Sequence, residues 1–207
     1  MEYLKSVTQT KAFQWTINKV RENTYPYYYG KGSWEADHIT DNIWLGSLAS
    51  AYDREALKSR NITRIITAAY DINPVFNKDT EIIYLTIPVI DDPSEEIAKH
   101  FDKAVDFINE SLAAGRGVLV HCIFGISRSS TLLCAYLIKK RGMSLINAIE
   151  FVKSKRQKAN PNEGFLKQLL KYENLPLVLN KYEDCQTPFF LIGIEEPTQL
   201  YRSNASL

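Results

Sequence analysis

VLVHCIFGISRSS, residues 118–130, is the segment of this chain that decides its fold. Its apolar beginning predicts a buried strand that ends at Val120, and a helix is expected to begin near Arg128. Where a strand turns into a helix, the unpaired amides of the first helical turn and the positive end of the helix dipole attract anions. The segment therefore predicts a strand–loop–helix unit whose loop binds an anion.

Two side chains of this loop predict its chemistry. Arg128 presents a planar fork of donors that binds two phosphate oxygens at once and stays charged at any working pH. Cys122 lies at the floor of the loop in the same positive field, which favours its nucleophilic thiolate form. A lone cysteine after an apolar strand is usually a small core residue. Five residues separate this pair, with Gly125 among them, and that pattern predicts attack on a bound phosphate ester through a cysteinyl-phosphate intermediate.

The other residues of the loop are expected to support this pair. Gly125 allows the backbone to curl without a Cβ in the way. Ser129 is expected to donate a hydrogen bond to the cysteine sulfur and to help it leave in the second step. His121 is expected to orient the loop from behind rather than to act as a base. The predicted phosphate-binding set consists of Arg128 and the backbone of Ile123, Phe124, Gly125, Ile126 and Ser127.

A carboxylic acid on a second loop is also expected, because the alcohol that leaves a phosphate ester needs a proton. Asp91 and Asp92 compete for this role. The tetrapeptide Asp92-Pro93-Ser94-Glu95 is typical of a helix start, with a capping Asp, Pro at the first position and Glu three residues after the cap. Because that start occupies Asp92, Asp91 is the favoured acid and Asp92 the alternative.

Strand-like and helix-like stretches alternate around the loop, which predicts the fold class. Strands are expected at 43–45, 62–68, 81–89 and 117–120, and helices at 95–114, 129–141, 144–156 and 161–172. Gly142 is expected to end the second helix and Asn160 to cap the fourth. The prediction is an α/β domain with a central, mostly parallel sheet of four to five strands flanked by helices.

Two zones flank this domain, which is expected to span residues 38–176. An N-terminal extension, residues 1–37, contains a predicted short helix and the Tyr-rich turn 25–30. A C-terminal tail, residues 177–207, contains the apolar run 189–194. Both are expected to pack on the domain. For the Tyr-rich turn, contact with the substrate is the alternative; for the apolar run, an added strand or a docking segment for a partner.

The composition excludes several classes of protein. The chain has 207 residues with 25 Lys and Arg against 24 Asp and Glu, a balance that gives no reason to expect a nucleic-acid partner. Its three cysteines are scattered and suggest neither a disulfide framework nor a zinc site. No apolar run is long enough for a membrane span, and no signal peptide is evident. A cytoplasmic protein, with the nucleus as a further location, is expected; its oligomeric state is not indicated.

The loop resembles a known signature. His121 to Ser129 fits the HCxxGxSRS motif of the dual-specificity protein phosphatases, members of the Cys-x5-Arg protein tyrosine phosphatase superfamily. The family acid lies ten residues before an aromatic, here Phe101, which supports Asp91. Phe124 stands where the family commonly has alanine and is expected to shape the rim. The resemblance covers about residues 38–176 and extends to Ile43–Gly46, Ile87–Asp91, Ala135–Leu137 and Pro161–Leu169.

The resemblance implies a protein phosphatase that hydrolyses phosphotyrosine and also phosphoserine and phosphothreonine. The expected substrate is a phosphorylated protein, with no metal or other cofactor, because the loop amides and Arg128 stabilise the charge. The alternatives are a phosphoinositide or glucan phosphatase and a phosphate-binding module without turnover. Lipid phosphatases of the family tend to carry lysines in the loop, where Ile123 and Ile126 stand here, and the intact Cys122 argues against a module without turnover.

Three further residues are open at this stage. Cys134 is expected to pack in the core, with an oxidative link to Cys122 as the alternative. Arg156 and Lys158 are expected to belong to a solvated basic surface, with attraction of a second phosphate as the alternative.

Overall fold

The computed structural model describes residues 32–70, 72–76 and 80–173. The predicted N-terminal helix, the Tyr-rich turn 25–30 and the apolar run 189–194 lie outside these residues. The boundaries proposed for the three zones of the chain remain predictions.

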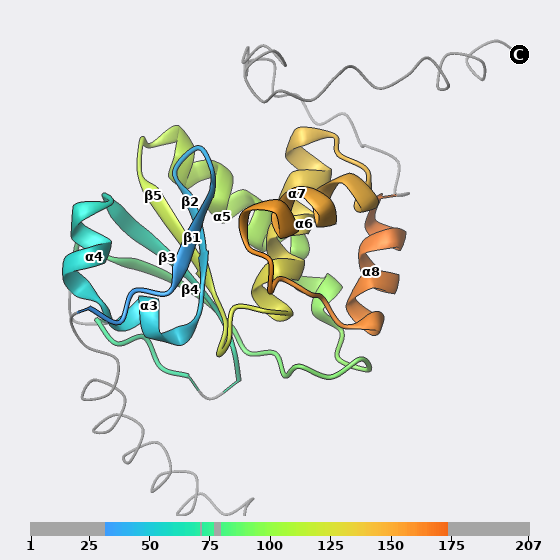
Figure 1. Ribbon diagram of the computed structural model, residues 1–207, viewed down its shortest axis with the longest axis horizontal. Helices are drawn as coiled ribbons and strands as arrows, with labels where there is room; N and C mark the ends of the chain where they lie inside the picture. The colour runs from blue at the N-terminus through green and yellow to red at the C-terminus, as the bar shows by residue number, and fades with distance from the viewer. Residues whose placement is uncertain (1–31, 71, 77–79, 174–207) are drawn as a thin grey trace, which may run out of the picture. The chain divides into compact units, whose positions relative to one another are not determined.

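Five strands of the described chain form one sheet. They are β1 (Ala36–Thr40), β2 (Ile43–Gly46), β3 (Ile62–Ala68), β4 (Ile83–Ile87) and β5 (Gly117–His121). Their order in space is β1-β2-β5-β3-β4, with β1 antiparallel to β2 and the other neighbouring pairs parallel (Figure 1). The predicted fold class is confirmed. The four predicted strands are present, and β1 is an edge strand that its mixed polar sequence did not indicate.

Strand β5 lies in the middle of the sheet, and both of its faces are covered. All five of its residues are buried, as expected for a strand packed on both sides. Val120 belongs to the larger core, with side chains of the long helices, whereas Leu119 belongs to a smaller core that contains Leu57 of a short helix. Because β5 is buried over its full length, the loop that follows starts from a fixed position.

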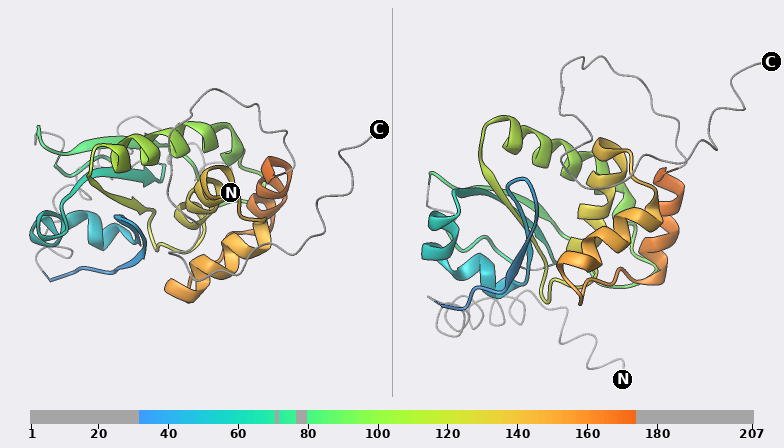
Figure 2. Two further views of the ribbon diagram at one scale, coloured as in Figure 1. Left: turned by 90° about the horizontal axis from the view of Figure 1, so that it is seen from above. Right: turned by 45° about the horizontal axis from the view of Figure 1, so that its top comes forward.

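Helices lie on both faces of the sheet. Figure 2 shows α5 on one side of the sheet and the short helices α3 and α4 on the other. The apolar faces of the long helices bury the larger core, which also contains Leu45, Ile66 and Val120 of the sheet. The bounds are α3 (Leu48–Tyr52), α4 (Arg54–Ser59), α5 (Phe101–Ala113), α6 (Arg128–Arg141), α7 (Leu145–Lys155) and α8 (Glu163–Glu173). The four long helices were predicted and the two short ones were not.

Gly142 ends α6 as predicted, in the left-handed conformation with φ of 63°. The predicted cap of α8 is wrong: the helix begins at Glu163, and the Asn162 side chain accepts the Phe165 amide at 3.0 Å. The amide of Asn160 instead donates to the Ile126 carbonyl at 2.8 Å, which ties Asn160 to the loop after β5.

The predicted start of the helix at 95–114 is also wrong. Residues Asp92 to Glu95 form a turn, a 3-10 turn (η1) follows at Ile97–His100, and α5 begins at Phe101. The reason is a tertiary contact. The Glu95 carbonyl and the Ala98 amide bond to the Gln168 side chain of α8 and not to backbone groups of a regular helix.

Candidate active site

The loop between β5 and α6, residues 122–127, is held by backbone bonds from outside it. The Leu48 amide donates to the Ile123 carbonyl at 3.1 Å, and the Asn160 amide donates to the Ile126 carbonyl at 2.8 Å. We call these six residues the phosphate loop. Its two flanks are therefore tied to the first residue of α3 and to the segment that precedes α8.

Cys122 lies at the base of the phosphate loop and is only 1% exposed. Its sulfur accepts hydrogen bonds from the Gly125 amide at 3.2 Å and from the Ser129 hydroxyl at 3.3 Å. Both bonds fix the position of the sulfur at the base of the loop. The hydroxyl that the sequence suggested as a donor thus lies within reach of the sulfur.

Arg128 begins α6 and has a buried guanidinium group. One Nη atom donates to the Val89 carbonyl at 3.3 Å. Its Nε lies 3.5 Å from the Asp91 carboxylate, yet it is buried without a hydrogen-bond partner. A buried donor without an acceptor is unfavourable, so this nitrogen is well placed for an oxyanion in the loop.

His121 is fully buried behind the phosphate loop. Its Nδ1 lies 3.2 Å from the Cys122 carbonyl and its Nε2 lies 2.9 Å from the Thr67 hydroxyl. Burial lowers the pKa of His121 to about 4. The hydrogen bond to the Cys122 carbonyl raises this pKa, and the nearby charge of Arg128 lowers it further. The ring is therefore neutral near pH 7, with Nδ1 donating to the carbonyl and Nε2 accepting from Thr67.

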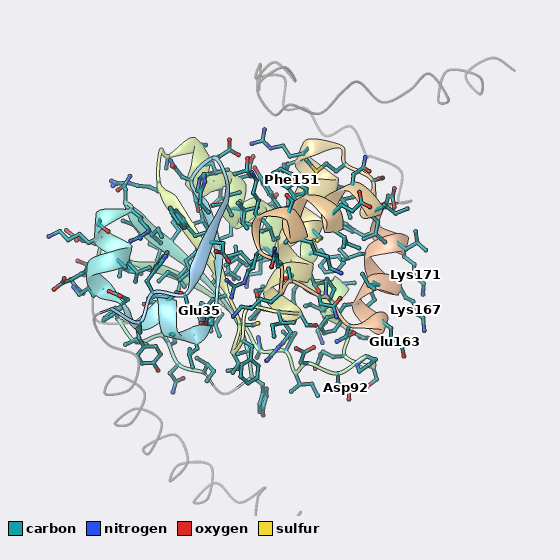
Figure 3. All side chains as sticks on the ribbon, in the orientation of Figure 1. Glu35, Asp92, Phe151, Glu163, Lys167 and Lys171 are labelled. Atoms are coloured by element: carbon teal, nitrogen blue, oxygen red, sulfur yellow. The ribbon has the colours of Figure 1, made fainter. Side chains whose placement is uncertain are left out.

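The two candidate acids point to different partners. Asp91 accepts a hydrogen bond from the Asn162 side chain at 3.0 Å, and its other oxygen faces Arg128. Asp92 accepts from the Ser94 amide at 2.8 Å and from the Ser94 hydroxyl at 2.5 Å. These two bonds lower the pKa of Asp92, which lies at the outer edge of its loop (Figure 3). Asp92 therefore takes part in a turn and does not cap a helix.

Gly125 and Phe124 set the shape of the phosphate loop. Gly125 has φ of 65°, and a Cβ there would lie 2.5 Å from the Gly46 carbonyl oxygen, so only glycine fits. Phe124 is 65% exposed and stands at the rim, whereas Ile123 packs against the small cluster around Tyr52. The remaining positions of the predicted phosphate-binding set are Ile126, which is partly buried, and Ser127, whose hydroxyl accepts the Asn162 amide at 3.1 Å.

Arg156 is a supporting residue that sequence reasoning missed. It is 3% exposed, so its assignment to a solvated surface or to a second phosphate is wrong. Its guanidinium donates to the Gly125 carbonyl at 2.8 Å, to the Phe124 carbonyl at 3.4 Å and to the Asp37 carboxylate at 2.6 Å. These partners lie 31 or more residues away in the chain, and no local sequence pattern predicts such contacts. Lys158 pairs with Glu35, which also lies near Arg156 (Figure 3).

Neither a metal cluster nor a membrane helix is found in the part of the chain that the structure describes. No three His, Cys, Asp or Glu side chains gather there as metal ligands, and no helix is long and apolar enough to cross a bilayer. Cys134 lies in the core of the same region, and burial raises the pKa of its thiol to about 12. Its thiolate form is therefore strongly disfavoured at neutral pH.

Known proteins resemble this chain over most of the residues that the structure describes. Residues 43–175 match the family model for the dual specificity phosphatase catalytic domain. Dual specificity protein phosphatase 1 of Arabidopsis thaliana is 42% identical over 144 residues, which cover 70% of this chain and 72% of that protein. Dual specificity protein phosphatase 1B of the same plant is 39% identical over 143 residues, 69% of this chain and 84% of that protein. The crystal structure of DUSP15 is 34% identical with a TM-score of 0.63, covering 70% of this chain and 88% of its own.

Proposed function

Since this chain belongs to the dual specificity phosphatase family, as a phosphoric monoester hydrolase with dual-specificity protein phosphatase activity, we propose that Cys122 is its nucleophile. The observation that carries the proposal is the pairing of two groups in one loop. The Cys122 sulfur accepts two hydrogen bonds, and the Arg128 Nε is buried with no hydrogen-bond partner. A phosphate monoester bound in the loop satisfies that nitrogen and presents its phosphorus to the sulfur.

The phosphate loop supplies the binding and the charge stabilisation. The amides of residues 123–127 and the Arg128 guanidinium surround the phosphate oxygens as charge develops on them. His121 contributes indirectly, because its neutral ring fixes the Cys122 carbonyl and leaves the positive field of the loop to the amides and Arg128. We assign Phe124 to the rim, where it contacts the residues next to the phosphorylated side chain.

The reaction proceeds in two steps. In the first, the Cys122 sulfur bonds to phosphorus, the ester P–O bond breaks, and Asp91 gives its proton to the leaving oxygen. In the second, water attacks the phosphocysteine, Asp91 takes a proton from that water, and the P–S bond breaks to release inorganic phosphate. Ser129 stabilises the departing thiolate through its hydrogen bond to sulfur.

Phosphorylated protein is the substrate class that the loop favours. Ile123 and Ile126 add no positive charge to it, whereas a multiply phosphorylated inositol ring calls for several cations. A panel of phosphotyrosine, phosphothreonine and phosphoinositide substrates ranks these classes directly, and a preference for the phosphoinositides would reverse this assignment.

An aryl phosphate assay tests the catalytic roles. Cys122→Ser is expected to abolish turnover, and Asp91→Asn to lower kcat strongly while substrate still binds. Asp92→Asn is the matched control and is expected to keep near-normal kcat, because Asp92 is engaged by Ser94. Equal activity of wild type and Cys122→Ser would refute the nucleophile, and a large loss in Asp92→Asn alone would transfer the role of acid to Asp92.

A further inference from the structure

Residues 90–96, which follow β4 and carry Asp91, form what we call the acid loop. Its side chains have little apolar cover: Ile90 is 48% exposed, and the Asp91 side chain is 34% exposed. A loop with few buried apolar contacts is held in place mainly by its polar bonds. The position of the acid therefore depends on the polar groups that the acid loop meets.

Gln168 on α8 uses both ends of its amide to bind the end of the acid loop. Its Nε2 donates to the Glu95 carbonyl at 2.8 Å, and its Oε1 accepts the Ala98 amide at 2.9 Å. These two backbone groups are the ones that a regular helix start would have used internally. The Gln168 side chain thus fixes where the acid loop ends and where α5 begins to form.

Two further residues show that α8 is the seat of the acid loop. A Cβ on Gly164 would lie 1.8 Å from the Pro93 carbonyl oxygen, so the loop backbone rests directly on the helix. Asn162 caps α8 through its Oδ1 and holds the Asp91 carboxylate through its Nδ2. Asn162, just before α8, and Gly164 and Gln168, within it, therefore contact the acid loop at its beginning, middle and end.

We propose that Gln168 is a positioning residue for the general acid: by holding the acid loop on α8, it keeps Asp91 within reach of the leaving oxygen. The inference rests on the proposed role of Asp91. It assigns to Gln168 no contact with the substrate. Misplacement of a catalytic group by about 1 Å lowers a rate by up to about 10²-fold, and a loosened loop is expected to lose part of that factor.

The test exploits the chemistry of the leaving group. Protonation matters for phenyl phosphate, whose leaving group is basic like that of phosphotyrosine, and matters little for difluoromethylumbelliferyl phosphate, which leaves readily as an anion. Gln168→Met keeps the length of the side chain and removes both hydrogen bonds. It is expected to lower kcat/KM, which reports the first step, about tenfold on phenyl phosphate and less than about twofold on the activated ester. Affinity for vanadate, which probes the phosphate loop, is expected to stay unchanged.

Lys167→Met is the matched control, because Lys167 is the neighbour of Gln168 on the exposed side of α8 (Figure 3). It is expected to behave like wild type on both esters. Gln168→Glu is a second variant that keeps an acceptor for the Ala98 amide but places a carboxylate oxygen against the Glu95 carbonyl; it is expected to show a loss of the same kind that is at least as large. Thermal unfolding of each variant verifies that it is folded under the assay conditions.

The outcomes separate this inference from the role of Asp91. Asp91→Asn is measured beside the Gln168 variants on both esters. If Asp91→Asn loses equal kcat/KM on both, the proposed acid itself is wrong. If Asp91→Asn shows the leaving-group dependence and the folded Gln168 variants do not, the positioning role is overturned while the acid stands. Equal losses of Gln168→Met on both esters, or weaker vanadate binding, would also overturn it, because Gln168 would then support the fold rather than the acid.

Discussion

In the proposed mechanism the phosphate loop and the acid loop supply the two halves of one reaction, yet they are built in opposite ways. Cys122, the first residue of the phosphate loop, and Arg128, directly after the loop, are 1% and 7% exposed. Arg156 supports the loop by donating to the Gly125 carbonyl. The acid loop is largely exposed and rests on one helix, α8. The difference follows from chemistry: an oxyanion site works through fixed, dry dipoles, whereas the proposed acid must meet the leaving oxygen in the first step and the attacking water in the second.

This comparison predicts how substitutions in the two loops differ. Changes in the phosphate loop reduce the reaction of every ester alike, because they alter binding of the phosphoryl group itself. Changes in the acid loop slow the first step only for esters whose leaving group needs a proton. The four predictions that follow concern the phosphate loop and its supports.

The largest effect is expected for Arg128→Lys. A lysine ammonium cannot bind two phosphate oxygens in the planar geometry of a guanidinium. Loss of one such contact to the developing charge lowers kcat by about 10³-fold, equally on phenyl phosphate and on an activated ester. Arg141→Lys, at the other end of α6, is the control and is expected to react like wild type. A loss confined to phenyl phosphate would place Arg128 with the acid instead.

Gly125→Ala and Gly142→Ala form a matched pair, because the two glycines have φ of 65° and 63°. An alanine at either place carries the strain of a left-handed conformation, about 1–2 kcal/mol. At Gly125 the added Cβ also meets the Gly46 carbonyl oxygen at 2.5 Å, whereas at Gly142 nothing lies within 4 Å. Chemical unfolding is expected to show a loss of about 3–4 kcal/mol for Gly125→Ala, with strain and crowding combined, and about 1 kcal/mol for Gly142→Ala. Equal losses would contradict the close approach of the two backbones.

His121 makes the support of the phosphate loop sensitive to acid. Its pKa is about 4 in the folded protein and about 6.5 in an unfolded chain, so the unfolded state binds the extra proton first as the pH falls. The stabilising contribution is complete above pH 6.5 and is lost between about 6.5 and 4, on the order of 3 kcal/mol in all. The free energy of unfolding of His121→Gln is expected to depend less on pH across this window than that of wild type. Parallel pH profiles would show that folding does not lower the pKa of His121.

Asp37→Asn is expected to have the smallest effect. The Asp37 side chain is 46% exposed, so its ion pair with Arg156 contributes about 0.5 kcal/mol. Arg156 keeps its bond to the Gly125 carbonyl in the variant. Turnover is expected to stay within about twofold of wild type, and the stability difference to shrink at high salt. A loss of turnover as large as that of Gly125→Ala would show that β1 is essential for the phosphate loop.

The sequence predicted the parts of this structure whose signals are local. The strand, loop and helix at residues 117–141 combine an apolar run, a glycine turn and a Cys–Arg spacing within a few residues, and all three elements are present. Gly142 ended its helix as expected because the left-handed position is a property of one residue. Asp92 was expected to be occupied as a helix cap; it is occupied by Ser94, in a turn that does not start a helix, and the choice of Asp91 as the acid stays a prediction.

The sequence could not predict the supports of the two loops, because those depend on distant contacts. Arg156 looks like any other residue in a basic cluster, and only the fold places the Gly125 carbonyl beside it. Gln168 likewise displaces the predicted helix start from 70 residues away. Strand β1 contains polar residues because it is an edge strand, and three of its five residues are only partly buried.

Rapid quenching of Asp91→Asn with difluoromethylumbelliferyl phosphate tests the central claim most directly. This variant is expected to release the fluorophore in a fast burst, because the activated leaving group needs no acid, and then to turn over slowly, because the base for the second step is missing. Mass spectrometry of the quenched protein is expected to find a phosphoryl group on the peptide that contains Cys122. A burst without any covalent phosphate, or phosphate on another residue, would contradict the account.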